Sequence, residues 1–184
     1  PYAYTTIKGF DTSGTTTNDK LDLPSSLIST DAVNVNGTDA NGLKSHSISS
    51  GIITFFGTDL GGSSVLINQS NFMDAIKYLS INLPVKGSTA GFYIDTNNDG
   101  FNDSLGVFQQ MSQVASQANS PYDTETFVLL SGVVGATLGK VQSQNVVTIV
   151  SSIGPDGSRP VEFTNSGFSF DANESLQSWV TSGF

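Results

Sequence analysis

The chain has 184 residues, which is enough for one domain or for one domain and part of a neighbour. Only 12% of the residues are charged, and the dispersed basic residues are outnumbered by acids to a net charge of −9, so we expect no nucleic-acid partner. The absence of cysteine excludes disulfides and thiolate metal sites, and no run of about 18 apolar residues predicts membrane insertion.

The first part of the chain is rich in Ser, Thr, Asn and Gly, a composition that favours strands and turns over helices. Residues 2–10 are predicted to form a strand, followed by a polar loop over residues 12–18. Leu21 and Leu23 alternate with charged neighbours, which indicates a strand with one buried face. Residues 30–44, with two Asn-Gly pairs, are predicted to be mainly turns.

The middle of the chain combines strands with one helix. Residues 48–56 are predicted to form a strand interrupted by Gly51, and residues 65–67 a short strand. Asn68 or Ser70 is expected to cap the helix that follows, and Pro84 to end it. Its apolar stripe comprises Phe72, Ile76, Leu79 and Leu83.

Residues 89–94 and 104–108 are predicted to pair as a hairpin. The stretch 109–119 is compatible with a short helix or a loop. Residues 124–134 form a continuous apolar run, which indicates a strand buried on both faces, and residues 145–150 form another strand.

A turn of composition Gly-Pro-Asp-Gly at residues 154–157 is the best candidate for a domain boundary. We therefore expect one β domain over residues 1–150, and the loop described next indicates that this domain binds calcium. Residues 151–184 are either further strands of that domain or the start of a following module.

The loop between the two strands of the predicted hairpin has the spacing of a calcium site. Asp95, Asn97 and Asp99 alternate, Phe101 offers a carbonyl, and Asp103 binds directly or through water. Ca²⁺ takes about six to eight oxygen ligands, and these are the residue types that supply them. Gly100 stands where the backbone must bend sharply and where a Cβ would obstruct. The alternative is a metal-free turn, because Asn, Asp and Gly also favour hairpin turns.

A second metal site is predicted around Asp11, Asp19 and Asp22, with Asn18 in the same loop. Asp19 and Asp22 are three residues apart, so they do not point the same way along a strand, and Asp11 is expected to join one of them. The alternative is a solvated polar loop. Asp123 and Glu125 are expected to be solvated charges at a strand end, the alternative being that they complete the hairpin site.

Catalytic motifs are sparse in this chain. His46, the only histidine, is expected at the surface or partly buried. A single histidine without cysteine excludes the usual zinc sites, which need several His or Cys ligands. The G-x-S-x-G motif of serine hydrolases does not occur. We therefore expect no enzyme.

Three segments, in this order, resemble the C-terminal region of RTX proteins, which are large calcium-dependent proteins exported by type I secretion. They are Ile-Lys-Gly-Phe-Asp (7–11) with Asn-Asp-Lys-Leu-Asp-Leu (18–23), the hairpin at 92–108, and Phe-Val-Leu-Leu-Ser-Gly-Val (127–133) after Asp123. They span roughly the first 150 residues. The glycine-rich nonapeptide repeat of calcium β-rolls is absent, so the resemblance favours a module outside the roll.

The resemblance implies a mainly β fold, namely a calcium-stabilised antiparallel β-sandwich with one or two short helices. It implies a secreted or cell-surface location within a larger polypeptide. The expected function is a non-catalytic, Ca²⁺-dependent module of an adhesin that binds an extracellular peptide or carbohydrate through residues that the sequence does not identify. One alternative is a structural surface-layer or spacer domain rigidified by Ca²⁺, and a second is a polysaccharide-active enzyme.

Overall fold

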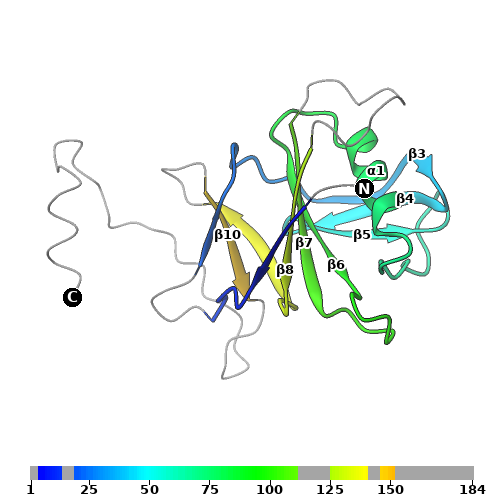
Figure 1. The fold of residues 1–184 in the computed structure, drawn as a ribbon. Coiled ribbons are helices and arrows are strands. Elements are labelled where there is room, and N and C mark those ends of the chain that lie inside the picture. Colours follow the sequence, from blue (N-terminus) through cyan, green and yellow to red (C-terminus); the bar gives the residue numbers. More distant parts are fainter. Residues whose placement is uncertain (1–3, 14–18, 112–124, 141–145, 152–184) are drawn as a thin grey trace, which may run out of the picture.

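The computed structural model describes residues 4–13, 19–111, 125–140 and 146–151. The fold is mainly β, as predicted, with one helix in the described part of the chain (Figure 1). The strands are β1 (Thr5–Lys8), β2 (Lys20–Asp22), β3 (Ala32–Ala40), β4 (Leu43–Ser49), β5 (Ile52–Phe56), β6 (Thr89–Ile94), β7 (Ser104–Gln110), β8 (Glu125–Ser131), β9 (Ala136–Lys140) and β10 (Val146–Ser151); the helix is α1 (Phe72–Asn82).

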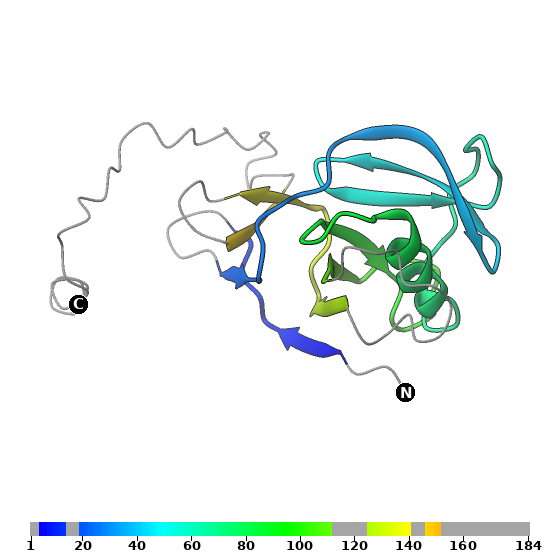
Figure 2. The ribbon, with the colours of Figure 1, turned by 90° about the horizontal axis from the view of Figure 1, so that it is seen from above.

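Seven strands form one sheet in the order β1-β8-β7-β6-β5-β4-β3, and three form a second sheet in the order β2-β10-β9. The larger sheet is mixed rather than purely antiparallel, because β1 pairs with β8, and β5 with β6, in parallel. Parallel neighbours need a crossover connection, and α1 lies in the one between β5 and β6. Strands β3, β4 and β5 arch across this helix (Figure 2).

The helix buries its apolar stripe against one face of the larger sheet. Ile76 and Leu79 are fully buried, and they share a cluster with Phe55, Phe92 and Phe108 from the strands. The helix ends at Asn82, before Pro84, as predicted. Its start differs from the prediction: the residue before it is Asn71, whose side chain makes no capping bond.

A second apolar cluster joins the two sheets. Leu21 and Leu23 from the β2 region and Leu138 from β9 pack with Leu105 and Leu130 of the larger sheet. Strand β8 is buried on both faces, as predicted, because Phe127 belongs to the helix-side cluster while Val128 and Leu130 belong to this one.

The prediction of turns over residues 30–44 was wrong. This stretch forms β3 and the start of β4, and only Asn41-Gly42 is the turn, with φ of 43° and 95°. Asn-Gly pairs mark a hairpin only where both residues adopt positive φ between paired strands. The second pair, Asn36-Gly37, lies inside β3, where the register with β4 is irregular.

The interruption predicted at Gly51 is a complete turn between two strands. Ser50 and Gly51 both have positive φ and form a tight turn, so residues 48–56 divide between β4 and β5. The Asp31 carboxylate accepts the Ser50 N–H at 2.7 Å and thereby fixes this turn. Residues 65–67 form no strand, since only the isolated bridges Phe56–Ser64 and Asn68–Asp95 flank them.

The C-terminal predictions fall mostly outside the described residues. Of the stretch 109–119, predicted as a helix or a loop, Gln109 and Gln110 belong instead to β7. Residues 112–119, Asp123 and residues 152–184 lie outside the described ranges, so the rest of that prediction and the boundary at 154–157 stay predictions. Strand β9 was missed by the sequence analysis. Within the described ranges, α1 is too short to cross a lipid bilayer.

Candidate functional site

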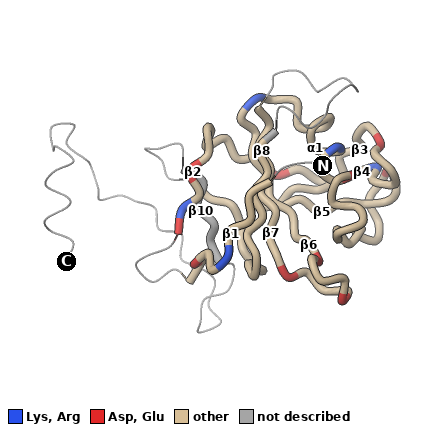
Figure 3. The backbone as a smooth tube through the Cα atoms, in the orientation of Figure 1, with Lys and Arg blue, Asp and Glu red and all other residues tan. Residues whose placement is uncertain are grey.

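The predicted calcium loop connects β6 to β7 and projects from one end of the larger sheet (Figure 1). The two strands pair in antiparallel register up to Ile94 and Ser104, so residues 95–103 form the hairpin connection. The Asp103 N–H donates to the Ile94 carbonyl at 3.0 Å and closes the base of the loop. Acidic residues mark this end of the molecule in Figure 3.

Asp95 is the most deeply buried acid of the loop, with 1% of its surface exposed. Its Oδ2 accepts the Gly100 N–H at 2.8 Å, and its Oδ1 accepts the Asp99 N–H at 3.2 Å. Its own N–H donates to the Ile67 carbonyl at 2.8 Å. Within the described part of the chain, no basic side chain forms an ion pair with Asp95. This is unusual, because buried charges are generally paired or bind metals.

Asn97 and Asp99 also bend the backbone by accepting N–H groups of the same loop. Asn97 Oδ1 accepts the Asp99 N–H at 2.9 Å, and Asp99 Oδ1 accepts the Phe101 N–H at 2.9 Å. The Asn97 Nδ2 group donates to Asp99 Oδ2 at 3.1 Å. Each carboxylate oxygen keeps a further lone pair when it accepts one N–H. The three side chains therefore remain capable of binding a hard cation.

Glycine is needed at position 100 because of the backbone conformation and not because a side chain would lack space. Its φ is 93°, in the region that favours glycine, but a Cβ built there would meet no atom within 4 Å. The prediction that a Cβ would obstruct was wrong on this point, whereas the sharp bend is present. Asn98, at φ 60°, shares the left-handed conformation.

Asp103 points to the base of the loop. Its Oδ1 accepts the hydroxyls of Thr96 at 2.6 Å and Ser104 at 2.7 Å, and its Oδ2 accepts the Thr96 N–H at 3.2 Å. Burial acts to raise the pKa of Asp103, but these hydrogen bonds outweigh it and hold the pKa below its ordinary value. Asp103 thus fixes the loop in the form described.

No cluster of three or more His, Cys, Asp or Glu side chains able to hold a metal occurs among the residues that the structure describes. Asp95, Asn97 and Asp99 are close neighbours in one loop, while Asp103 bonds elsewhere. The Phe101 side chain is 75% exposed at the tip. The atoms that these three side chains could offer to a metal are all oxygens, which Ca²⁺ prefers.

The second predicted metal site is brought together in part. The Asp11 N–H donates to Asp19 Oδ2 at 2.9 Å, and the Asp19 N–H donates to the Asp11 carbonyl at 3.0 Å. Asp11 Oδ1 accepts the Ser13 N–H, and hydrogen bonds from Ser13 lower the pKa of Asp11. Asp22 is exposed on β2, and the three acids form no metal-holding cluster among the residues that the structure describes. Glu125 opens β8, and Asn18 lies outside the described residues.

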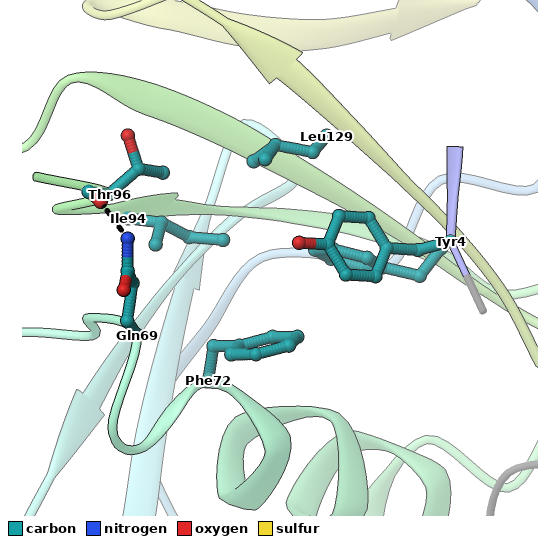
Figure 4. A pocket seen from close by; sticks show the side chains of 7 residues that line it. Tyr4, Gln69, Phe72, Ile94, Thr96 and Leu129 are labelled. Atoms are coloured by element: carbon teal, nitrogen blue, oxygen red, sulfur yellow. Dashed lines mark hydrogen bonds between the residues drawn. The ribbon is translucent and has the colours of Figure 1, made fainter. Parts of the chain in front are cut away.

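A pocket of about 110 Å³ opens beside the loop (Figure 4). Its walls come from the residue before β1, from β6 and β8, from the start of α1, and from the segments just before α1 and just after β6: Tyr4, Gln69, Phe72, Ile94, Thr96, Phe127 and Leu129. The Tyr4 ring meets Phe72 and Phe127 edge to face, at centroid distances of 5.7 and 5.8 Å. Tyr4 is 44% exposed, so the aromatic wall is accessible.

The pocket and the loop share Thr96, and Gln69 of the pocket is bonded to it. Gln69 donates from Nε2 to the Thr96 carbonyl, as the dashed line in Figure 4 marks. Thr96 in turn donates to Asp103. The sequence does not predict this pocket, because its walls lie far apart along the chain. The only local signal was Phe72 at the end of the apolar stripe.

His46 is buried, contrary to the expectation of a surface or partly buried residue. Its Nδ1 lies 2.9 Å from the Tyr78 hydroxyl, and burial lowers the pKa of His46. Burial, helped by the nearby charge of Asp39, raises the pKa of Tyr78 to about 12. The pair joins β4 to α1 inside the core.

Comparison of the chain with protein-family models, with curated proteins and with solved structures gave no match.

Proposed function

We propose that this chain is a non-catalytic, Ca²⁺-dependent ligand-binding module of a secreted bacterial adhesin, at the cell surface and within a larger polypeptide. The observation that carries the proposal is the Asp95 carboxylate, which is buried without an ion-pair partner among the described residues. A bound cation would offset the cost of burying this charge. Calcium supplies that positive charge together with a preference for many oxygen ligands.

Asp95, Asn97 and Asp99 would hold the ion, with the Phe101 carbonyl as a further ligand. Their alternate spacing and their curled hydrogen bonds support this set. Asp103 would contribute by fixing the base of the loop through Thr96 and Ser104, or by binding through water. Asp11 and Asp19 are the best candidates for a second site because they already contact each other.

The pocket beside the loop supports ligand binding over a purely structural role. Its size, about 110 Å³, suits one apolar side chain or ring, and its accessible wall is aromatic. A peptide with an apolar side chain therefore fits better than a carbohydrate, which needs more polar partners than Gln69, Thr96 and Tyr4 offer. Because Thr96 belongs to both the pocket and the loop, a cation that orders the loop would also hold this wall of the pocket in place.

We further propose that the two sheets act as one calcium-stabilised β-sandwich, since residues of both share the second apolar cluster. Extracellular location is consistent with the lack of cysteine, because bound calcium would take the place of disulfides.

The calcium part is tested by thermal unfolding with and without Ca²⁺. At a free Ca²⁺ concentration of 100 times Kd, mass action stabilises by about 2.7 kcal/mol, which corresponds to a Tm rise of roughly 5–10 °C. Asp95→Asn should lose most of this rise. The matched control Asp59→Asn changes an exposed acid outside the loop and should retain it. An equal rise in both variants would exclude the loop as the site.

The ligand part is tested with peptide and oligosaccharide arrays, each probed in Ca²⁺ and in chelator. We expect Ca²⁺-dependent binding to peptides with apolar residues. Leu129→Trp, which fills the pocket, should abolish binding and keep the Ca²⁺-induced Tm rise. If neither array shows Ca²⁺-dependent binding while the Tm rise persists, the alternative of a calcium-rigidified spacer is correct.

The spacer alternative has its own support, since the side chains of Asp103, Asn97 and Asp99 already accept main-chain N–H groups and hold the loop in one conformation. A polysaccharide-active enzyme, the other alternative, is favoured by no observation within the described ranges.

A further inference from the structure

His46 lies where strand β4 meets strand β3 and helix α1. It is the only histidine of the chain, and its side chain is buried in the structure. Its cross-strand neighbours are apolar, namely Val35 on β3 and Phe55 on β5. Among the described residues, no carboxylate forms an ion pair with it. An imidazolium ion at this place would therefore lose most of its hydration without a compensating charge in contact.

The helix contributes a neutral partner to the ring. The Tyr78 hydroxyl lies 2.9 Å from His46 Nδ1, and the two rings meet edge to face with centroids 5.5 Å apart. Burial, together with the charge of Asp39, raises the pKa of Tyr78 to about 12. Tyr78 thus stays uncharged near neutral pH and offers no negative charge to a protonated His46.

The charged groups of the surrounding elements are engaged with other residues. The Lys44 ammonium of β4 lies 4.0 Å from the Asp39 carboxylate of β3 and 3.9 Å from the Asp59 carboxylate beyond β5. The side chains of both acids are more than half exposed, so water screens their charge. On α1, the Asp74 carboxylate accepts a hydrogen bond from the β3–β4 turn.

We infer that His46 is an acid-sensitive switch in the β4–α1 junction, and that protonation of its imidazole weakens the packing of α1 on the strands. The neutral ring fits the junction, whereas the charged ring favours states in which it reaches water. Helix α1 begins at Phe72, which also forms one wall of the pocket, so the switch acts on the pocket as well. The inference depends neither on calcium nor on a ligand.

The direction of the pH dependence follows from burial, which lowers the pKa of His46. The contribution of His46 to stability is fully present above the unfolded pKa of about 6.5 and is lost as the pH falls toward the lower folded value. The test is urea unfolding between about pH 7.5 and pH 5, a range in which ordinary Asp and Glu side chains do not titrate. Below about pH 6.5, the unfolding equilibrium constant should rise by up to about tenfold per pH unit, because unfolding takes up one proton.

Two variants separate His46 from the acids around it. His46→Gln removes the titrating ring and keeps a group that can bond to the Tyr78 hydroxyl, so its stability should not change over this pH range. Asp39→Asn is the matched control, since it removes a nearby charge and should keep the full pH dependence. Dependence that survives in His46→Gln, or that is lost in Asp39→Asn, would overturn the inference.

Two measurements on the unaltered chain cover the case in which His46→Gln fails to fold. By NMR, the single histidine should titrate in the folded chain below its ordinary value of about 6.5. In native-state hydrogen exchange, corrected for the intrinsic effect of pH, the amides of α1 should lose more protection on acidification than those of β7. Titration at or above the ordinary value, or equal loss of protection in the two elements, would overturn the inference.

Discussion

Gly100 and Asp103 show that single residues determine the shape of the loop in different ways. Gly100 supplies a backbone conformation at φ 93°, with open space around it. Asp103 supplies a carboxylate that three donor groups of Thr96 and Ser104 hold at the base. Substitution of either residue should therefore change the stability of the protein even without added metal.

Replacing Gly100 with Ala should destabilise the protein by about 1–2 kcal/mol, because an L residue is strained in the left-handed region. Urea unfolding in chelator measures this difference. Gly57→Ala is the control, since the φ of Gly57 is not positive and its Cβ would make ordinary contacts at 3.5 Å. Equal losses in the two variants would show that φ is not the reason for Gly100.

Stability should fall as acid protonates Asp103. Its folded pKa is lowered, so its contribution is fully present above the unfolded value of about 3.9 and is lost as the pH falls through the lower folded value. Asp103→Asn should therefore reduce the dependence of unfolding free energy on pH below about 4. Thr96→Val, which removes one donor, should have an intermediate effect. If the stability of Asp103→Asn depended on pH as that of the unaltered chain does, Asp103 would not stabilise the base of the loop.

At the scale of elements, α1 is the main support of the larger sheet. Leu79→Ala should cost about 2–5 kcal/mol, because Leu79 is fully buried between the helix and the sheet. Val85→Ala, three residues beyond the end of α1 and 57% exposed, should be close to neutral in the same urea titration. Similar small effects for both would mean that the helix packs loosely.

The sequence predicted those elements whose pattern is local. The helix stripe, the hairpin of β6 and β7 and the two-faced burial of β8 follow directly from periodicity or from apolar runs. The predictions failed over β3, where Asn36-Gly37 looks like a turn and instead makes room for Tyr78 and Asn82. That reason is tertiary and involves a helix some forty residues away, so no local pattern contains it.

The same distinction applies to the candidate site. The alternation of Asp95, Asn97 and Asp99 is local, and the structure places these residues in one curled loop as the spacing suggests. The position of Asp103 depends on Thr96 and Ser104 across the hairpin, and the pocket depends on four separate segments. Neither is visible in the spacing of acidic residues.

At the scale of the whole molecule, two apolar clusters support opposite faces of the same sheet, and the loop lies at one end of it. A ligand for the loop would therefore stabilise the hairpin that both clusters share, since β6 and β7 contribute to each. We expect chelator to lower the Tm of the whole domain in one transition rather than to melt the loop alone. Far-UV circular dichroism and tryptic digestion with and without Ca²⁺ measure this, and loss of the loop alone would contradict it.

The most direct measurement of the central claim is isothermal titration of Ca²⁺ into the chelator-treated chain and into its Asp95→Asn variant. We expect saturable binding to the unaltered chain and affinity at least about tenfold weaker in Asp95→Asn, because the variant lacks the buried charge that a bound ion would offset. Absence of binding at millimolar Ca²⁺, or equal affinity in the two proteins, would contradict it.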